Sequence, residues 1–412
     1  MLRPHVAGGG AQTRGRIQAI PMIHLLYSAD YELYLGSLAQ PEAAVLLAPT
    51  AQLLATCEKI GIPLTLFADV ACLWRYRELN RHPFPDQAEA QLVAAIRQGH
   101  DVQTHLHPHW ITTRFDGARF HFDPKDYRIG TISPDPEACG RLARIWLQRA
   151  TDHLTTLLTP HAPDYRCLAF RAGGYGLQPH EGVLLQALYA TGYRIDSSIV
   201  PGARFATPVQ EVDFTAVPAL GNYWLAPATG LATPAPQGTG LFEIPIAACR
   251  FSAQERRAVR VPEALRQALA LLTNRPTPPV RGLPCTLPAT PDDTTDTLAA
   301  SRLKRAYWRA RAILANDFQR LELGTDLRAL LACFDRYVRT RQSTQPEEPL
   351  FLSMNIHPKG IHPAHLDTLT RFHQTLLQRH PGKIRAITFQ QAWQLLNRDP
   401  VGMCGQTAPA SR

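Results

Sequence analysis

Three histidines at alternate positions form the densest group of chemically active side chains in this sequence. His105, His107 and His109 lie at the end of the strand-like segment 101–107 and just after it. Neutral imidazole is a common metal ligand, and clustered histidines at a strand end can converge on one ion. Because Pro108 predicts a turn, we expect His105 and His109 to bind the metal from two sides of that turn. A polar surface loop that happens to contain histidine is the alternative.

Two carboxylates follow an earlier apolar segment. Asp30 and Glu32 are separated by one residue, so in an extended chain their side chains point the same way. Beside a metal, one carboxylate can bind the ion while the other takes a proton from metal-bound water. A solvated strand end is the competing interpretation. The assignment gains weight because both groups of residues end predicted strands.

The elements that position these residues alternate between short apolar strands and amphipathic helices. We expect strands at 20–28, 63–70, 101–107, 167–173, 193–198, 241–247, 349–358 and 383–389, and helices at 50–60, 85–98, 135–158, 181–192 and 364–379. Such alternation is typical of an α/β protein with a parallel sheet or barrel. The polar residues fall at the carboxyl ends of the strands, where barrel enzymes keep their active sites.

The chain reads as one domain with a large insertion. We expect a flexible tail at 1–19, a domain at 20–400 and a C-terminal tail at 401–412. The insertion covers about 250–345. It contains a Pro/Thr-rich loop at 274–298, predicted to be mobile, and a pair of helices within 300–342.

Composition excludes several classes of protein. The chain has 412 residues, of which 45% are hydrophobic and 19% charged, so it can bury a large core and is not globally disordered. No apolar stretch reaches the roughly 20 residues of a membrane helix, and no secretory signal is visible. Eight scattered cysteines without a CxxC motif favour a reducing cytoplasm over a disulfide scaffold.

The net charge of +9 leaves the partner open. A nucleic acid, an anionic lipid headgroup and an acidic glycan all attract a basic surface. The arginines are spread along the chain, apart from a dense stretch at 302–311, so we do not expect specific nucleic-acid binding. No phosphate-binding glycine motif and no G-x-S-x-G motif occur, which argues against nucleotide binding and serine hydrolysis.

Taken in order, five segments resemble the motifs of the polysaccharide deacetylase family, also called NodB-homology amidases. Segment 28–31 (SADY) resembles T-F-D-D, and 105–109 (HLHPH) keeps the histidine spacing of H-[ST]-x-x-H. Segment 170–175 (FRAGGY) resembles the arginine motif, 192–202 contains the D-S motif, and 352–358 contains the final histidine, His357. The segment 387–396 resembles the closing strand and helix. The similarity covers roughly 20–200, 240–250 and 349–397.

The resemblance implies an irregular (β/α) barrel of the NodB type with one divalent metal, most simply Zn²⁺, at the carboxyl ends of the strands. The implied metal ligands are Glu32, His105 and His109, with Asp30 as base. Asp30 could instead replace Glu32 as ligand. The resemblance also implies that Arg171 fixes Asp30, that His357 is the general acid and that Asp196 orients His357. The implied substrate contacts are Tyr175, Gly174 and His107.

This chain departs from the family pattern at four places. Tyr31 stands where the family has a second aspartate, and Leu106 replaces a small hydroxyl residue. His107 is additional and could be a ligand, a substrate contact or a structural residue. Ile199 and Val200 stand where the family often has Asp-Trp, so the acyl pocket could differ in shape.

The implied reaction is metal-dependent hydrolysis of an N-acyl group, most simply N-acetyl, from an amino sugar of a polysaccharide or its precursor. A glycan or a lipid-linked glycan would be the substrate. Two alternatives stay open: a catalytically degenerate barrel that binds glycan or a partner, and a metal-independent C–N hydrolase of small cyclic amides.

Overall fold

A computed structural model provides the structure of the chain. It describes residues 22–34, 40–207, 209–218, 221–273, 298–324, 326–344 and 349–398. The predicted tails at 1–19 and 401–412 and the predicted loop at 274–298, except its last residue, lie outside the described residues.

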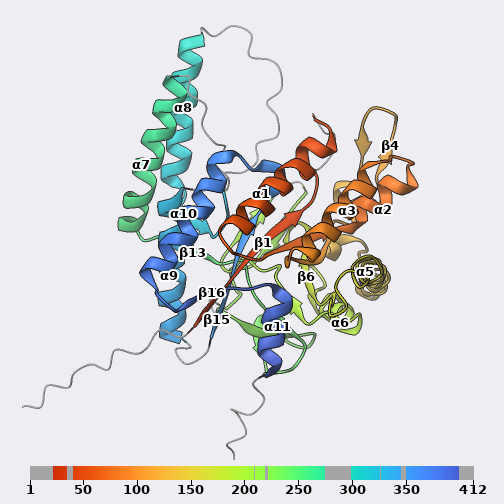
Figure 1. The fold of residues 1–412 in the computed structure, drawn as a ribbon. Coiled ribbons are helices and arrows are strands. Elements are labelled where there is room, and N and C mark those ends of the chain that lie inside the picture. Colours follow the sequence, from red (N-terminus) through yellow and green to blue (C-terminus); the bar gives the residue numbers. More distant parts are fainter. Residues whose placement is uncertain are drawn as a thin grey trace, which may run out of the picture.

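The centre of the molecule is a sheet of parallel strands with helices packed outside it (Figure 1). The parallel strands are β1 (Ile23–Tyr31), β2 (Leu64–Asp69), β3 (Asp101–Leu106), β6 (Ala169–Ala172), β7 (Ile195–Asp196), β12 (Leu241–Glu243), β15 (Leu350–Ile356) and β16 (Ile384–Ala386). Their order is β12-β7-β6-β3-β2-β1-β15, and β16 also pairs with β1. The antiparallel strands β10 (Tyr223–Ala226) and β11 (Gly230–Ala235) extend the sheet beyond β12.

The sheet is an arc, so the irregular (β/α) barrel expected from the sequence is present only in part. Between its ends, β15 meets the segment after β12 through an isolated bridge from Ser353 to Ile246 instead of a continuous ladder. The side chain of Asn222 spans the same gap, donating to the carbonyl of Phe351 at 2.8 Å and accepting from its N–H at 2.9 Å. The α/β class is therefore as expected. The barrel is incomplete because β15 and the segment after β12 are joined by one bridge and by the Asn222 side chain, not by a ladder of strand hydrogen bonds.

Helices cover the outer face of the arc. They are α1 (Ala48–Lys59), α2 (Val70–Glu78), α3 (Phe84–Arg97), α4 (His109–Thr112), α5 (Pro136–Leu158), α6 (Glu181–Ala190), α9 (Leu327–Thr344) and α10 (Pro363–Arg379). Helix α5 begins where the Asp135 side chain accepts from the N–H of Ala138 and a proline follows at the first helical position. Its buried residues recur at helical spacing, which directs one face onto the sheet.

The inner face of the arc is divided into an apolar half and a polar half. Leu26 and Phe351, near the amino ends of their strands, and Phe67, in the middle of β2, pack with Phe389 of α11 (Phe389–Arg398), which closes that end. Toward the carboxyl ends, the inward side chains become Ser28, Asp30 and other polar groups. All nine residues of β1 are buried, as is typical of a parallel strand covered on both faces.

The inserted region contains three helices and a small strand pair. Helices α7 (Ala253–Leu272) and α8 (Leu298–Ala315) pack along each other, and α9 packs on α10. The first helix of the pair expected within 300–342 ends at Ala315, and 318–320 form β14 (Phe318–Arg320), which pairs with β13 (Ala248–Arg250). Helix α7 was not anticipated, although Ser252 and Glu255 form a capping box at its start.

Two further strand pairs complete the described elements: β4 (Arg114–Phe115) with β5 (Phe120–His121), and β8 (Arg204–Ala206) with β9 (Glu211–Asp213). In the parts of the chain that the structure describes, no helix combines the length and the apolar character needed to cross a membrane.

Candidate active site

The parallel sheet brings residues that are far apart in sequence to one edge. In neighbouring strands, Asp69 is paired with His105, and His105 with Arg171. Asp196 is paired with Glu243 at the same edge. Because all these strands run in the same direction, their carboxyl ends deliver these side chains to one region. The loops that follow β1, β3 and β15 add Glu32, His107 and His357.

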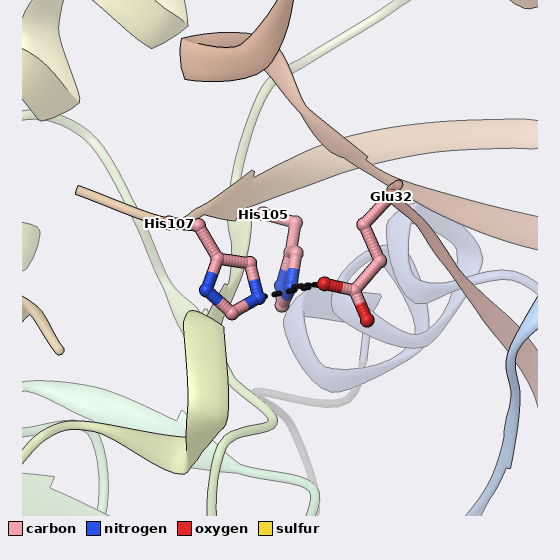
Figure 2. A group of neighbouring side chains, drawn as sticks. All are labelled: Glu32, His105 and His107. Atoms are coloured by element: carbon pink, nitrogen blue, oxygen red, sulfur yellow. Dashed lines mark ion pairs between the residues drawn. The ribbon is translucent and has the colours of Figure 1, made fainter. Parts of the chain in front are cut away.

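Glu32, His105 and His107 form a compact group with ligand atoms suited to a metal ion (Figure 2). The Oε2 atom of Glu32 lies 2.6 Å from Nε2 of His107 and 3.5 Å from Nε2 of His105. All three side chains are buried. Two imidazoles and one carboxylate are a ligand set that leaves an open position on a zinc ion for water or substrate.

The ring of His105 is held in one orientation by the backbone. Its Nδ1 lies 2.8 Å from the carbonyl oxygen of Arg171. A carbonyl only accepts, so Nδ1 carries the hydrogen, and in the neutral ring Nε2 keeps its lone pair toward Glu32. Metal-binding histidines are typically oriented in this way by a second partner. The buried Nε2 has no hydrogen-bond partner among the described residues, as expected of a nitrogen that binds a metal ion.

The structure places His107, rather than His109, beside Glu32 and His105. The chain turns at Pro108, and His109 is the first residue of α4. The ring of His109 lies among Trp110, Phe122 and Tyr127, with centroids 5.2–5.5 Å away. Burial, together with the neighbouring His107, lowers the pKa of His109 well below its usual value. The turn therefore directs His109 toward aromatic rings, while His107, still in line with the strand, reaches the carboxylate.

A glycine permits the close approach that positions His107. A Cβ on Gly173 would lie 2.5 Å from Nδ1 of His107 and 2.6 Å from the carbonyl oxygen of Leu106. Gly174, predicted to contact substrate, has φ of 61°, and its Cβ would lie 2.5 Å from the ring of Tyr127. The loop after β6 thus packs directly on the histidine segment.

We expect Gly173→Ala to displace His107. The added methyl group cannot avoid both a backbone oxygen and the histidine ring, so metal affinity should fall. Overpacking of this kind typically costs about 1–3 kcal/mol of unfolding free energy. Metal titration and thermal unfolding of the same variant measure the two effects. Unchanged affinity would show that the loop does not position His107.

Arg171 occupies the centre of the polar half of the arc. Its Nη1 donates to Asp30 Oδ1 at 2.7 Å and to Asn355 Oδ1 at 3.0 Å. The remaining donors bond the hydroxyls of Ser28, Ser197 and Ser353 and the carbonyl of Ser197. Arg171 is fully buried and also lies over the ring of Phe67. Removing one partner of a buried pair leaves an uncompensated charge, at a cost of about 3–5 kcal/mol.

Asp30 is held as an ionised carboxylate. Burial raises its pKa, but the positive charges of Arg171 and of His357 and His105 lower it, and the net shift is downward. Its Oδ2 accepts from Nδ2 of Asn355 at 3.2 Å and lies 3.3 Å from Nε2 of His357. Asp30 therefore lies between the arginine and the histidine, with one oxygen directed to each.

His357 follows β15 and faces carboxylates with both ring nitrogens. Nε2 lies 3.3 Å from Asp30 Oδ2, and Nδ1 lies 3.1 Å from Glu322 Oε1. A ring protonated on both nitrogens would have an acceptor on each side. Asp196, expected to orient this histidine, instead bonds Ser198, accepting from its hydroxyl at 2.7 Å and from its N–H at 3.1 Å. In the structure the carboxylate next to Nδ1 of His357 is that of Glu322, in an ion-pair contact rather than an oriented hydrogen bond.

Sequence reasoning missed Glu322 because it lies inside the insertion, between α8 and α9. Glu322 forms an isolated bridge with Asn355 of β15, which brings it next to His357. Arg320 Nη2 lies 2.6 Å from the Glu322 carboxylate. The only signal in the sequence was an acidic residue in the short apolar run at 321–323, which resembles many surface segments.

We expect Glu322→Gln to lower turnover by about tenfold or more while metal content stays unchanged, because the amide can no longer stabilise a proton on Nδ1 of His357. Steady-state kinetics over a pH series, with metal analysis of the same sample, checks this. A purely structural role would lower stability but leave the pH profile of the remaining activity unchanged.

Lys359 is a second residue that the sequence did not single out. Its Nζ donates to Glu32 Oε1 at 2.8 Å and to the carbonyl of Leu33 at 3.0 Å. Burial raises the pKa of Glu32, but Lys359 and the two histidines lower it, and the net value lies well below the usual range. Glu32 therefore has one oxygen toward the lysine and the other toward the histidines.

Asp196 and Glu243 form a buried acidic pair on adjoining strands. Burial raises the pKa of both groups, most strongly that of Glu243, whose shift the neighbouring Asp196 increases. A shared proton between two such carboxyl groups is the usual consequence. Because Asp196 also fixes Ser198, whose hydroxyl accepts from the N–H of Ala172, this pair supports the strand that carries Arg171.

Tyr175, predicted to contact substrate, is linked to Glu322 through Arg320, which contacts both side chains. Its hydroxyl accepts from Nη1 of Arg320 at 2.9 Å, and its ring stacks on Phe205. Its φ is 60°, an uncommon conformation for a residue other than glycine. Burial raises the pKa of Tyr175 to about 12, so the phenol stays neutral and can donate a hydrogen bond.

No model of a known protein family matches the sequence, and no curated protein does so. Among solved structures, one described as a polysaccharide deacetylase from Mycobacterium smegmatis has a TM-score of 0.44 and 13% identity, with 100% of both chains covered. The allantoinase Puue has a TM-score of 0.42 and 13% identity, with 92% of this chain and 91% of that chain covered. A structure described as a polysaccharide deacetylase from Pseudomonas aeruginosa has a TM-score of 0.42 and 14% identity, with 92% of both chains covered.

Identities of 13–14% concern the fold alone. With TM-scores below 0.5, the reaction has to be inferred from the side chains of the site.

Proposed function

We propose that this chain is a hydrolase that removes an N-acyl group, most simply N-acetyl, from an amino sugar with the help of one divalent metal ion. The observation that carries the proposal is the juxtaposition of two functional groups. Glu32, His105 and His107 converge on one point, and Asp30 and His357 lie directly beside it, with Nε2 of His357 3.7 Å from Glu32 Oε1. Hydrolysis of an amide needs a metal site with a general base and a general acid beside it, and these residues could supply all three.

The residues present fit a metal. The buried Nε2 of His105 has no hydrogen bond among the described residues, and the backbone fixes its lone pair toward Glu32. Zinc is the ion that two imidazoles and a carboxylate suit best. When bound there, it would polarise the acyl carbonyl and lower the pKa of a water ligand toward about 7.

Asp30 is suited to accept the proton of the attacking water. Arg171 fixes its orientation and keeps it ionised, while Oδ2 remains on the side of His357. An aspartate held by a fully hydrogen-bonded arginine cannot rotate away, which keeps the base in position.

His357 is suited to give a proton to the leaving amine. Its ring is partly exposed, unlike those of His105 and His107, so it borders the space that a substrate would enter. Glu322 supports a proton on the far nitrogen. Protonation matters because an unprotonated amine is a very poor leaving group.

The choice of an amino-sugar substrate comes from the family resemblance of the five sequence segments. A glycan or its lipid-linked precursor would occupy the edge of the sheet, with Tyr175 and the backbone at Gly174 as contacts. His107, expected as a substrate contact, is assigned here to the metal in place of His109.

The test is a panel of N-acetylated amino sugars and their oligomers incubated with the zinc-loaded protein. We expect equal amounts of acetate and free amine to appear, and a chelator to stop the reaction. Metal-loaded, folded protein that releases neither product would contradict the proposal and favour a binding role.

One observation favours a second candidate, a metal-independent hydrolase of small cyclic amides. The Nζ of Lys359 lies 2.8 Å from Glu32 and balances its negative charge. The site therefore has a positive charge of its own that does not depend on a metal ion. Activity on cyclic amides that persists after exhaustive chelation would support this candidate over the first.

A further inference from the structure

Helices α7 and α8 form a hairpin that stands apart from the catalytic region. The two helices lie side by side and extend beyond the rest of the molecule at one side (Figure 1). Inside the pair, small side chains such as Ala264 and Ala306 are buried and allow close packing. Helix α7 also packs on α9, so only the surfaces of the pair that face away from both contacts are available to a partner.

Large apolar side chains are exposed on this hairpin. Leu265 is 67% exposed, Leu269 62% and Leu303 64%. Single exposed leucines are ordinary, but exposed apolar side chains that gather in one patch mark an interaction surface. On α7 successive exposed apolar residues are four, four and three positions apart in the sequence. On α8 the distances are four and seven positions, so each set lies along one face of its helix. The complete set is Val261, Leu265, Leu269 and Leu272 on α7, and Leu303, Tyr307, Leu314 and the adjacent Trp308 on α8.

The same hairpin concentrates positive charge. It has nine basic side chains and two acidic ones, against a net charge of +9 for the whole chain. Both acidic residues are engaged within the protein: Glu255 caps α7 and pairs with Arg336, and Glu263 pairs with Arg260 in a buried position. Helix α8 has five basic residues and no acidic residue.

We propose that the hairpin α7–α8 docks on the surface of an anionic lipid bilayer. Amphipathic helices with leucine and aromatic residues beside arginine and lysine lie in the headgroup region of membranes. Tyr307 and Trp308, whose rings are 5.5 Å apart, supply the aromatic groups that prefer that region, and the guanidinium of Arg311 lies 5.1 Å from the Trp308 ring. The leucines would enter the acyl boundary while the basic residues contact lipid phosphates.

Charge distinguishes this occupant from a second copy of the chain. Two hairpins that meet face to face would bring like charges together and bury them, which opposes association. Anionic headgroups instead complement exposed basic side chains such as Lys304 and Arg305, at about 1 kcal/mol per residue near the surface. Arg260 and Arg266 are already paired with Glu263 and Asp326 and are not part of this surface. The inference does not depend on the reaction proposed above.

The test is sedimentation of the full-length protein with vesicles of neutral phosphatidylcholine, with or without anionic phosphatidylglycerol. We expect binding only to the anionic vesicles, weakened by salt. The double variant Lys304→Gln/Arg305→Gln should weaken binding by about 30-fold, from two charges at about 1 kcal/mol each. Leu265→Ser with Leu303→Ser should weaken it by a similar factor or more, because two leucines leave the acyl boundary. Each of these four residues is exposed, so folding should be preserved.

The matched control is Ile145→Ser on α5, which removes an equally exposed apolar side chain, 60% exposed, far from the hairpin in sequence. It should bind as the wild type does. Equal binding of wild type and hairpin variants would overturn the inference. Two other results would also overturn it. One is a dimer that the leucine variants abolish. The other is a monomer that does not bind vesicles and whose hairpin is protected from covalent labelling. The last two results would assign the face to a second copy or to residues 274–297.

Discussion

Replacing His107 by alanine should abolish high-affinity metal binding, and His105→Ala should do the same. Nε2 of His107 is the nitrogen nearest to Glu32, at 2.6 Å, and alanine removes it without an available substitute. Loss of an outer-shell partner typically lowers metal affinity by about 10–100-fold, and loss of a ligand should exceed that. Elemental analysis after dialysis, together with competition against a chromogenic chelator, measures the change.

His109→Ala is the matched comparison, because it removes a neighbouring buried imidazole from the same segment. The structure predicts that this variant keeps the metal, although loss of the ring contacts with Phe122 and Tyr127 should lower its stability. Metal lost from His109→Ala and kept by His107→Ala would reverse the assignment and restore the ligand pair expected from the H-x-x-x-H spacing.

Replacing His357 by alanine should lower amide turnover by about 10²–10⁴-fold with the metal retained, the usual contribution of one general acid. The ring lies within reach of Asp30 and Glu322 but outside the group formed by Glu32, His105 and His107. Single-turnover hydrolysis by a metal-loaded variant measures the effect on the chemical step.

Leaving-group dependence provides the control for this variant. An activated ester needs little protonation of its leaving group, so His357→Ala should lower ester turnover much less than amide turnover. Equal losses on the two substrates would show that His357 is not the acid. Loss of the metal in this variant would place it among the ligands, beside Asp30 and Glu32, with which it also forms a compact group.

The residues at the carboxyl ends of the strands were the part of the site most accessible from sequence. Short apolar runs ending in Asp30, His105, Arg171 and His357 predict parallel strands, and parallel strands place their ends at one edge. The pairing of Arg171 with Asp30 could also be anticipated, because a buried arginine needs a carboxylate partner.

Other features depended on contacts that spacing cannot determine. Whether His107 or His109 faces Glu32 depends on where the turn at Pro108 begins, and a shift of one residue changes the face. Glu322 comes close to His357 through an isolated bridge between a short segment inside the insertion and β15. The open arc follows from single bridges and the side chain of Asn222, which have no periodic signature.

A zinc titration of the metal-free protein, with acetate release from an N-acetylated amino sugar as the signal, tests the central claim most directly. The geometry of Glu32, His105 and His107 predicts a rate that rises linearly and becomes constant at about one equivalent of zinc per chain. A rate already maximal without metal, or a saturated metal site that releases no acetate from any amino sugar in the panel, would contradict it.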